Sequence, residues 1–274
     1  RRSSDLCELM DLIGHDTNFS VTQSVFEANF FDRRFTPSLV QRELVDGGLL
    51  GRKCGRGFYS YPEGAPALSE MKLAALPAHA QWVVHGSGAV AEALVAAVSQ
   101  HLGGKPASRA TSSDWVGVEV AGLQLRQTDG RPAWQVAQDT GVKELALFDE
   151  LPTVVGGALA FATTGRADTS DMAAAVLHAL GYAPVCVADA PGLVVARTLV
   201  MLVNEAADAV EQGVCTTEGA NAAMKLGVNY PAGPFDWLDR IGHARVVAVL
   251  DALDACYRGE RYRVSPWLQR PAHA

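Results

Sequence analysis

Residues 236–243 read Asp-Trp-Leu-Asp-Arg-Ile-Gly-His, and residues 8–15 read Glu-Leu-Met-Asp-Leu-Ile-Gly-His, at an offset of 228 residues. Apolar residues at helical spacing follow each stretch. An aromatic-Pro segment comes next in both places, Phe35-Thr-Pro in the first and Tyr262-Arg-Val-Ser-Pro in the second. We interpret the two stretches as two copies of one helical unit.

The second copy shows what a complete unit contains. The pattern predicts a long helix from Pro191, a favoured first helical residue, to Gly213, a favoured helix cap. A shorter helix capped by Thr216 or Thr217 is expected next. By comparison, the first copy lacks about 38 residues ahead of Asp11. We therefore expect the chain to be the interior of a longer polypeptide.

The helices predicted within residues 8–31 present an apolar face that has no long helix of its own copy to cover it. A large exposed apolar face favours aggregation. We therefore expect the two copies to pack on each other as an internal pseudo-dimer. The helix predicted over 191–213 would then contact residues 8–31 through Leu199, Leu202 and Val203.

Between the two copies the hydrophobic pattern changes to that of a strand, a turn and a helix. Residues 82–85 predict a buried strand, and Gly86-Ser-Gly88 with Ala91 leads into an apolar helix over 90–102. Glycines in this context allow the backbone to approach a pyrophosphate at a helix N-terminus. The turn is either a working dinucleotide site or a retained architectural feature.

The residues downstream of this turn differ from those of a typical dinucleotide site. Such a site has an acidic residue about 20 positions further on, which binds the ribose hydroxyls. Ser108 and Arg109 stand there instead, and the first acidic residue is Asp114. Arg109 could bind a 2′-phosphate.

Further strands and helices alternate up to about residue 188. This alternation predicts a mostly parallel sheet covered on both faces. The helices are expected at 132–138 and 171–180, the second capped by Thr169 or Ser170. The strands are expected at 117–120, 123–127, 144–148, 154–161 and 183–187.

The composition limits the class of protein. Of the 274 residues, 49% are hydrophobic and 19% are charged, which excludes a wholly disordered chain. The net charge of −7 makes a nucleic-acid or anionic membrane partner a poor candidate, and no stretch resembles a membrane-spanning helix. Five scattered cysteines without a C-x-x-C pair indicate a cytoplasmic protein without a structural metal.

Two parts of the chain resemble the C-terminal domain of 3-hydroxyacyl-CoA dehydrogenases. Residues 8–61 include Leu50-Gly-Arg-Lys-Cys-Gly-Arg-Gly-Phe-Tyr-Ser-Tyr61, and residues 184–243 include Gly227-Val-Asn-Tyr-Pro-Ala-Gly-Pro-Phe235. The arrangement resembles the back half of the long, two-module 3-hydroxybutyryl-CoA dehydrogenases associated with phenylacetate breakdown. The resemblance implies an acyl-CoA substrate, and an NAD cofactor bound by a domain that lies upstream of Arg1.

The resemblance also implies a mixed fold of three parts. A truncated, degenerate Rossmann-like α/β domain over 67–188 would be flanked by all-α units that resemble the C-terminal domain of 6-phosphogluconate dehydrogenase. The unit at 1–66 would be partial, and the unit at 189–274 would be complete.

The catalytic residues of the family do not carry over. The family's His lies in a strand exit that reads roughly Gly-Leu-His-Phe-Phe-Asn-Pro, and the best counterpart here, residues 157–164, contains no His. The family's active-site Asn falls on Ala196. We therefore place no catalytic residue in this chain and expect it to be inactive alone. Asn204 and Glu205 are interpreted as members of a buried hydrogen-bonded contact between helices.

Two further groups have more than one interpretation. His15 and His243 occupy equivalent positions, and each is either a cap or surface histidine or a catalytic base. Arg52, Lys53 and Arg56 lie in a glycine-rich loop, and they either contact the phosphates of an acyl-CoA or form a solvated basic turn.

Two classes of function remain open. In the first, the chain is part of an NAD-dependent 3-hydroxyacyl-CoA dehydrogenase and supplies the helical side of the substrate cleft and an oligomer contact, including a possible homodimer. In the second, it is a stand-alone scaffold protein in which Gly86, Gly88 and Ala91 hold a nucleotide or CoA without turnover.

Overall fold

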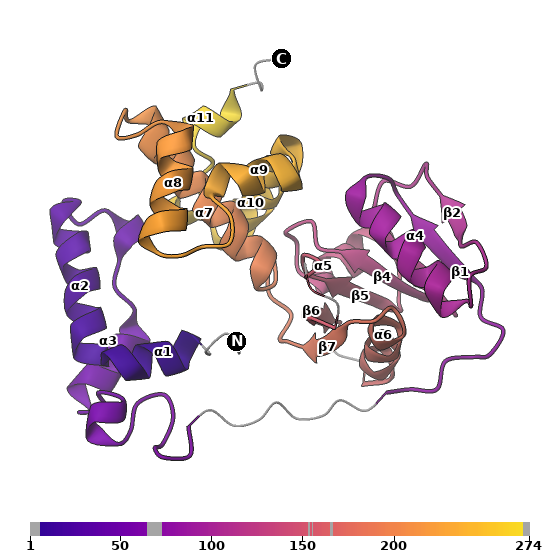
Figure 1. The fold of residues 1–274 in the computed structure, drawn as a ribbon, viewed down its shortest axis with the longest axis horizontal. Helices are drawn as coiled ribbons and strands as arrows, with labels where there is room; N and C mark the ends of the chain where they lie inside the picture. Colours follow the sequence, from indigo (N-terminus) through magenta and orange to yellow (C-terminus); the bar gives the residue numbers. More distant parts are fainter. Residues whose placement is uncertain (1–5, 65–72, 153, 155, 165–166, 271–274) are drawn as a thin grey trace. The chain divides into compact units, whose positions relative to one another are not determined.

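The computed structural model describes residues 6–64, 73–152, 154, 156–164 and 167–270. The chain divides into two compact units, Arg1–Glu70 and Met71–Ala274 (Figure 1). The boundary predicted between residues 66 and 67 lies outside the described residues. The boundary predicted between residues 188 and 189 lies inside the second unit, where strands and helices pack together.

The regular elements of the first unit's described part are helices, and residues 51–60 add two isolated β-bridges. Gly14 separates the first two helices because its φ of 101° breaks the right-handed helix, and its amide still bonds back to Met10. Ser38 caps the third α-helix by accepting a hydrogen bond from the Gln41 amide. The elements are α1 Leu6–Ile13, α2 His15–Ala28, η1 Arg33–Phe35, α3 Leu39–Asp46 and η2 Arg52–Cys54.

The second unit begins with a seven-stranded sheet in the order β2-β1-β3-β4-β5-β6-β7. Helix α4 (Ala89–His101) connects β1 to β2, α5 (Ala133–Thr140) connects β4 to β5, and α6 (Ala167–Ala179) connects β6 to β7. The strands are β1 Trp82–His85, β2 Ser108–Ala110, β3 Gly117–Val120, β4 Leu123–Gln127, β5 Leu145–Phe148, β6 Ala158–Thr163 and β7 Ala183–Cys186.

The sheet is mixed, so the expectation of a mostly parallel sheet is met at only three of its six strand pairs. The pairs β1–β2, β4–β5 and β6–β7 are parallel, whereas β1–β3, β3–β4 and β5–β6 are antiparallel. Each parallel pair is joined through a helix, while β3 and β4 are joined by a tight turn at Ala121 and Gly122, which both have positive φ. Strands β1, β2, β4 and β5 therefore all end at one edge, here named the Gly86 edge.

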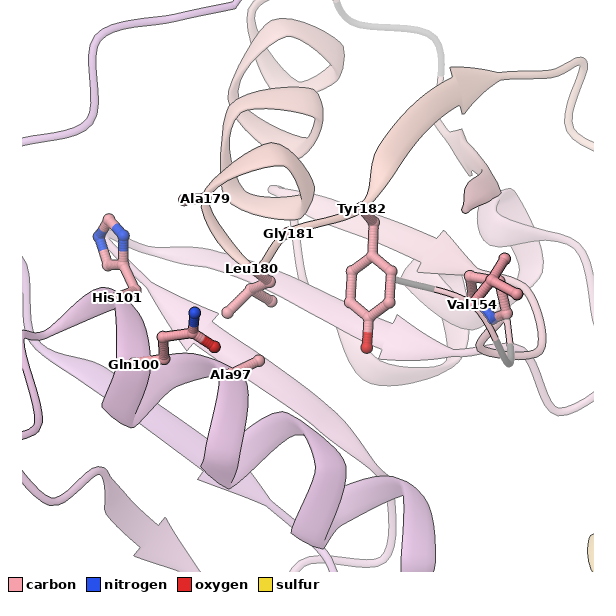
Figure 2. Close-up of a pocket in the computed structure, with 9 residues that line it drawn as sticks. Ala97, Gln100, His101, Val154, Ala179, Leu180, Gly181 and Tyr182 are labelled. Carbon is pink, nitrogen blue, oxygen red and sulfur yellow. The ribbon is translucent and has the colours of Figure 1, made fainter. Parts of the chain in front are cut away.

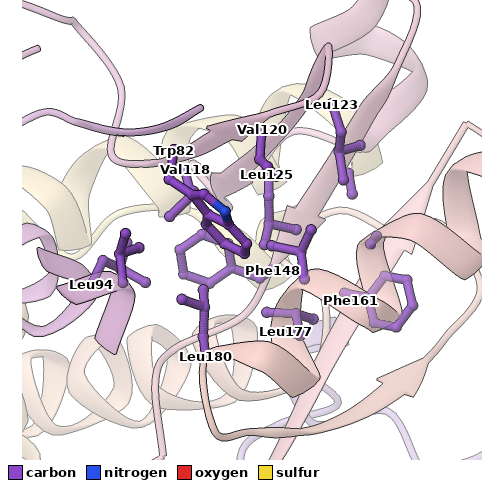
Figure 3. Close-up of a cluster of buried hydrophobic side chains, with 14 of the residues drawn as sticks. Trp82, Leu94, Val118, Val120, Leu123, Leu125, Phe148, Phe161, Leu177 and Leu180 are labelled. Atoms are coloured by element: carbon purple, nitrogen blue, oxygen red, sulfur yellow. The ribbon is translucent and has the colours of Figure 1, made fainter. Parts of the chain in front are cut away.

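Helices cover both faces of the sheet. One face packs on α4 and α6 and forms the main core, which includes Trp82, Leu94, Phe148 and Phe161 (Figure 3). The other face packs on α5 in a smaller cluster. All four residues of β5 are buried, because alternate side chains enter the two clusters.

The rest of the second unit is helical and packs around one long helix, α7 (Val195–Glu211). Helices α9 and α10 bury Trp237, Val249 and Leu253 in a cluster with Val203 of α7. The remaining elements are α8 Thr217–Gly227, α9 Pro234–Ile241, α10 His243–Tyr257, η3 Glu260–Tyr262 and α11 Pro266–Gln269.

Asp149, the residue after β5, joins the sheet to α7. Its buried carboxylate accepts hydrogen bonds from the amides of Val194, Val195 and Ala196, at distances of 2.7 to 2.9 Å. These amides are among those that a helix start leaves without internal partners. The carboxylate therefore caps α7 from a strand 45 residues earlier in the chain.

Two further contacts hold the sheet against α10. Gly130 follows β4, and a Cβ atom at this position would lie 2.8 Å from the Val249 carbonyl oxygen. Arg245 of α10 donates to the Thr128 carbonyl at 2.9 Å and also bonds Glu150. The sheet and the helices of the second unit thus share a close contact along α10.

The expected elements match the structure at most positions, with three corrections. Strand β2 was not expected, since its three residues are too few to show a period. Helix α6 begins at Ala167, and Thr169 is a buried residue within it that donates to Glu144 instead of capping it. Helix α7 begins at Val195 instead of Pro191, because the positive φ of Gly192 and Leu193 forms a turn there.

Removing the Asp149 carboxylate tests how strongly it holds α7. We expect Asp149→Ala to lower the free energy of unfolding by about 2 kcal/mol or more, because it leaves three amides without their acceptor. Urea unfolding followed by tryptophan fluorescence measures the change. The matched control is Asp251→Ala, which removes an exposed carboxylate of α10 and should change stability by less than about 0.5 kcal/mol. Equal effects of the two substitutions would contradict this role of Asp149.

Candidate functional site

The glycine turn lies where the sequence places it, between β1 and α4 at the Gly86 edge. Gly86 and Gly88 have φ values of 82° and 91°, which favour glycine, and Ala91 is fully buried. A Cβ atom at Gly88 would meet nothing within 4 Å, whereas one at Gly86 would lie 2.6 Å from the Trp115 carbonyl oxygen. Position 86 therefore requires glycine because the Trp115 backbone leaves no room for a side chain.

The connection between β2 and β3 crosses the end of β1 beside this turn. It does so because β3 runs antiparallel to β1, so that Gly117 at the start of β3 pairs with His85 at the end of β1. Trp115 stacks on the His85 ring at 4.0 Å between centroids, and Ser113 is hydrogen-bonded to His85 Nδ1 at 2.7 Å. Burial lowers the pKa of His85, although Glu119 opposes this effect. Residues of the chain itself thus lie over the end of β1.

Arg109, the candidate for a 2′-phosphate contact, is engaged within the domain. Its guanidinium lies 2.6 Å from a carboxylate oxygen of Glu92 in the first turn of α4. An anion at this helix start would therefore meet a carboxylate as well as the arginine.

The structure separates the predicted counterpart of the family's catalytic strand from Ala196, the predicted counterpart of the family's Asn. Strand β6, within residues 157–164, runs antiparallel to β5, so its exit lies at the edge opposite Asp149 and the start of α7. The exit of β5 lies beside α7 instead, and its sequence Leu145-Ala-Leu-Phe-Asp149 is similar to the Leu-His-Phe-Phe-Asn of the family pattern. In that comparison Ala146 stands in place of the His, and it is fully buried.

Ala196, the predicted counterpart of the family's active-site Asn, lies next to this strand exit. Its backbone amide donates to Asp149 Oδ1 at 2.7 Å, and its methyl group is buried. The end of β5 and the start of α7 thus contact each other through the hydrogen bonds of Asp149.

The first unit contains a buried polar cluster that the sequence analysis missed. Asp11 and His15 are fully buried, and their side chains are 2.7 Å apart. The Asp11 carboxylate also accepts the amides of Phe58 and Tyr59, at 2.9 and 3.0 Å, and the Tyr61 hydroxyl at 2.8 Å. The interpretation of His15 as a surface histidine was therefore wrong. An acid four residues before a histidine in one helical stretch was the available signal.

The glycines of the loop at 51–57 permit this cluster to form. A Cβ atom at Gly57 would lie 2.1 Å from Asp11 Oδ1, and one at Gly51 would lie 2.3 Å from the Asp11 carbonyl oxygen. Burial raises the pKa of Asp11, but hydrogen bonds from Phe58, Tyr59, Tyr61 and His15 outweigh it and hold the pKa below its usual value. The loop is thus a cradle for a buried carboxylate.

The three cations of this loop occupy different surroundings. Lys53 Nζ lies 2.6 Å from Asp16 Oδ2, and Arg52 lies 3.9 Å from Glu8 and over the Tyr61 ring. Arg56 is exposed. The predicted contact of Arg52, Lys53 and Arg56 with CoA stays a prediction.

The remaining candidates lie in the second helical part. Asn204 is buried, and it donates to the Arg263 carbonyl at 2.9 Å and accepts from the Ser265 amide at 2.8 Å. The predicted buried hydrogen-bonded contact is therefore confirmed for Asn204, whose partners lie between η3 and α11, while Glu205 is half-buried. His243 is half-buried at the start of α10, and Asp239, the equivalent of Asp11, is exposed.

A hollow of about 450 Å³ lies between the last turns of α4 and α6 (Figure 2). Gln100 and His101 line it from α4, and Leu180 and Tyr182 line it from the end of α6. It therefore lies at the far end of α4 from Gly86 and Gly88.

The described ranges hold neither a cluster of metal ligands nor a membrane-spanning helix. No three His, Cys, Asp or Glu side chains gather there in a way that could hold a metal ion. None of the helices there has the length and apolarity needed to cross a membrane.

Neutralising Asp11 should weaken the first unit in a pH-dependent way. A carboxyl whose pKa is lower in the folded state adds stability above its unfolded value of about 4, and this stability is lost as the pH falls below that value. We expect Asp11→Asn to lower the free energy of unfolding by about 2 kcal/mol at pH 7 and to flatten the loss of stability below pH 4. Urea unfolding at pH 7 and below pH 4, followed by circular dichroism, measures both effects.

The control for that experiment is Asp46→Asn, which removes an exposed ion pair with Arg42. Such pairs contribute little, so the control should behave as the unmodified chain at both pH values. A loss of stability below pH 4 that Asp11→Asn leaves unchanged would contradict the lowered pKa of Asp11.

Family models match most of the chain. The model for the C-terminal domain of 3-hydroxyacyl-CoA dehydrogenase matches residues 5–61 and again 192–274. The model for the reduced Rossmann-fold domain of 3-hydroxybutyryl-CoA dehydrogenase matches residues 125–191.

Similar proteins cover nearly the whole chain. It is 35% identical to the 3-hydroxyadipyl-CoA dehydrogenase of Escherichia coli strain K12, over 97% of this chain and 50% of that protein. It also resembles the crystal structure of 3-hydroxybutyryl-CoA dehydrogenase from Escherichia coli K12, with a TM-score of 0.75 and 33% identity over 96% of this chain and 49% of that one. A 3-hydroxybutyryl-CoA dehydrogenase of Clostridioides difficile is 34% identical over 39% of this chain and 38% of that protein. The chain thus spans about half the length of the E. coli proteins, and it belongs to the 3-hydroxyacyl-CoA dehydrogenase family.

Proposed function

We propose that this chain is the non-catalytic, C-terminal portion of an NAD-dependent 3-hydroxyacyl-CoA dehydrogenase. The observation that carries the proposal is the contact between β5 and α7, where Ala146 and Ala196 stand in the places of the family's His and Asn. Hydride transfer from a 3-hydroxyl group needs a base that removes the hydroxyl proton. Neither alanine can act as that base, and the nearby Asp149 carboxylate is committed to three backbone amides.

The glycine turn supports the same proposal. Trp115 and Ser113 lie over the end of β1, and Glu92 pairs with Arg109 beside the helix start. We infer that these residues do not fit a dinucleotide and that the Gly86 turn is architectural. The NAD of the whole enzyme would then be held by an upstream module.

The substrate is proposed from the relatives. Their names specify 3-hydroxyadipyl-CoA and 3-hydroxybutyryl-CoA, so we propose a 3-hydroxyacyl-CoA as the substrate of the whole enzyme. The helical parts of this chain would supply one side of the cleft and the oligomer contact. A role in phenylacetate breakdown belongs to the same proposal, and so does a cytoplasmic location.

The internal pseudo-dimer remains a prediction. Of its three named contacts on α7, Val203 is fully buried among residues of its own unit, and Leu199 and Leu202 are half-buried there.

The chain alone should not oxidise 3-hydroxybutyryl-CoA. We expect no NADH formation above the background when the purified chain is incubated with this substrate and NAD, because no base is available at the exit of β5. Absorbance of NADH at high chain concentration measures the rate, and the full-length E. coli relative with its own substrate serves as the positive control. A rate that rises in proportion to chain concentration would contradict the proposal.

NAD and NADP should not stabilise the fold. A ligand at 100 times its dissociation constant would add about 2.7 kcal/mol to the free energy of unfolding, so binding would be visible as a rise in melting temperature. We expect no saturable rise with either dinucleotide. A rise that is lost in Gly88→Val but kept in Gly122→Val would show a working site and favour a nucleotide-binding scaffold. Gly122 is a matched control because it also has a positive φ and open space around it.

A further inference from the structure

Helices α1 and α2 of the first unit have the same arrangement as α9 and α10 of the second. Gly14 and Gly242 separate the two helices in each pair, with φ and ψ of 101° and 131° at the first and 91° and 134° at the second. A 3-10 turn and a helix capped by serine follow in both places, with Ser38 ahead of α3 and Ser265 ahead of α11. Positions in the two segments can therefore be compared one by one.

Equivalent apolar positions are buried in the second unit and exposed in the first (Figure 1 locates the helices). At the offset of 228 residues, three pairs differ in this way: Trp237 is 7% exposed and Leu9 40%, Val249 1% and Val21 58%, and Leu253 0% and Val25 42%. The residues on α9 and α10 are buried in the cluster that contains α7. The first unit has no helix of this kind among its described residues.

Within its described residues, the first unit also lacks the hydrogen bonds that Asn204 makes to the backbone in the second unit. In the second unit Asn204 of α7 bonds the Arg263 carbonyl and the Ser265 amide, and Ser265 is fully buried. The segments that lead to the two capping serines are offset by 227 residues, so the equivalent backbone groups of the first unit belong to Thr36 and Ser38, which are both exposed. Within residues 6–64, the Ser38 amide donates to no protein acceptor. The face thus lacks both an apolar cover and a polar partner.

The described residues offer no second helix like α7, which has 17 residues. The apolar face of α7, with Val203 and Asn204, is already buried in its own unit. We therefore take the partner of this face to be a helix from another polypeptide segment. The predicted internal pseudo-dimer, in which α7 itself covers residues 8–31, is the competing arrangement.

We propose that the face formed by Leu9, Val21 and Val25, together with the backbone at Thr36 and Ser38, binds an amphipathic helix of the α7 type from outside these 274 residues. Its inward face carries valine and alanine side chains and one asparagine, which bridges the Thr36 carbonyl and the Ser38 amide. This surface completes the first unit in the way that α7 completes the second.

A labelled peptide with the sequence of residues 191–213 is the probe for this surface. Fluorescence anisotropy with the full 274-residue chain should show saturable binding. Val21→Asp in the chain should weaken binding at least tenfold, because it places a charge in the apolar contact. Ser20→Asp adds the same charge to an exposed position one residue away, about 100° around α2, and should leave binding unchanged. Asn204→Ala in the peptide should also weaken binding by roughly tenfold.

Joining the peptide covalently to the chain tests the same contact even when the free peptide does not fold as a helix. The same segment joined ahead of Arg1 through a Gly/Ser linker should raise the melting temperature of the chain, and Val21→Asp should remove the gain. Sedimentation equilibrium of the untethered chain identifies the competing occupant. Self-association that is abolished by Val21→Asp, without peptide binding, would assign the face to a second copy and overturn the proposal.

Absence of both peptide binding and the tethered gain overturns the proposal too, as does binding that Val21→Asp leaves intact. None of these measurements involves turnover. A chain that binds the peptide and also oxidises substrate would therefore refute the proposed function and leave this surface standing.

Discussion

The carboxylate of Asp149 is the contact on which the larger unit depends. It lies at the end of a strand that is buried on both faces, and it receives three amides from the start of α7. The direction of α7 relative to the sheet follows from that contact, and α9, α10 and α11 then pack around α7. A second carboxylate acts in the opposite direction, since Asp189 just before α7 accepts the amides of Ala133 and Trp134 at the start of α5. The residue after β5 thus caps α7, and a residue just before α7 caps α5.

The same use of a buried carboxylate organises the first unit. Asp11 is surrounded by backbone amides from a loop about 47 residues later, and two glycines permit the approach. The Gly-Arg-Gly-Phe-Tyr string that carries the family resemblance is therefore explained by packing around Asp11. A sequence motif that is specific to a family of enzymes can thus serve its architecture instead of its chemistry.

Much of the fold could be predicted because the relevant signals are local. The β3 and β4 strands and the cap at Thr216 follow from alternation and from capping preferences, and each lies where expected. The strand directions could not be predicted, because hydrophobic alternation is the same for parallel and antiparallel neighbours. The sequence therefore does not show that β5 and β6 end at opposite edges of the sheet. Asp149 was also missed, since its partners lie 45 or more residues away, and so were the amides of Phe58 and Tyr59 that bind Asp11.

The close approach of Gly130 to α10 has a consequence for motion. Domains that close on a substrate need a hinge and an interface that can part. Here the backbone after β4 lies against Val249 with no room for a side chain, and Arg245 and Asp149 bind across the same boundary. Opening it would break all of these contacts together. The described sheet and helices of the second unit are therefore expected to move together, so that in the proposed enzyme any closure would occur outside this boundary.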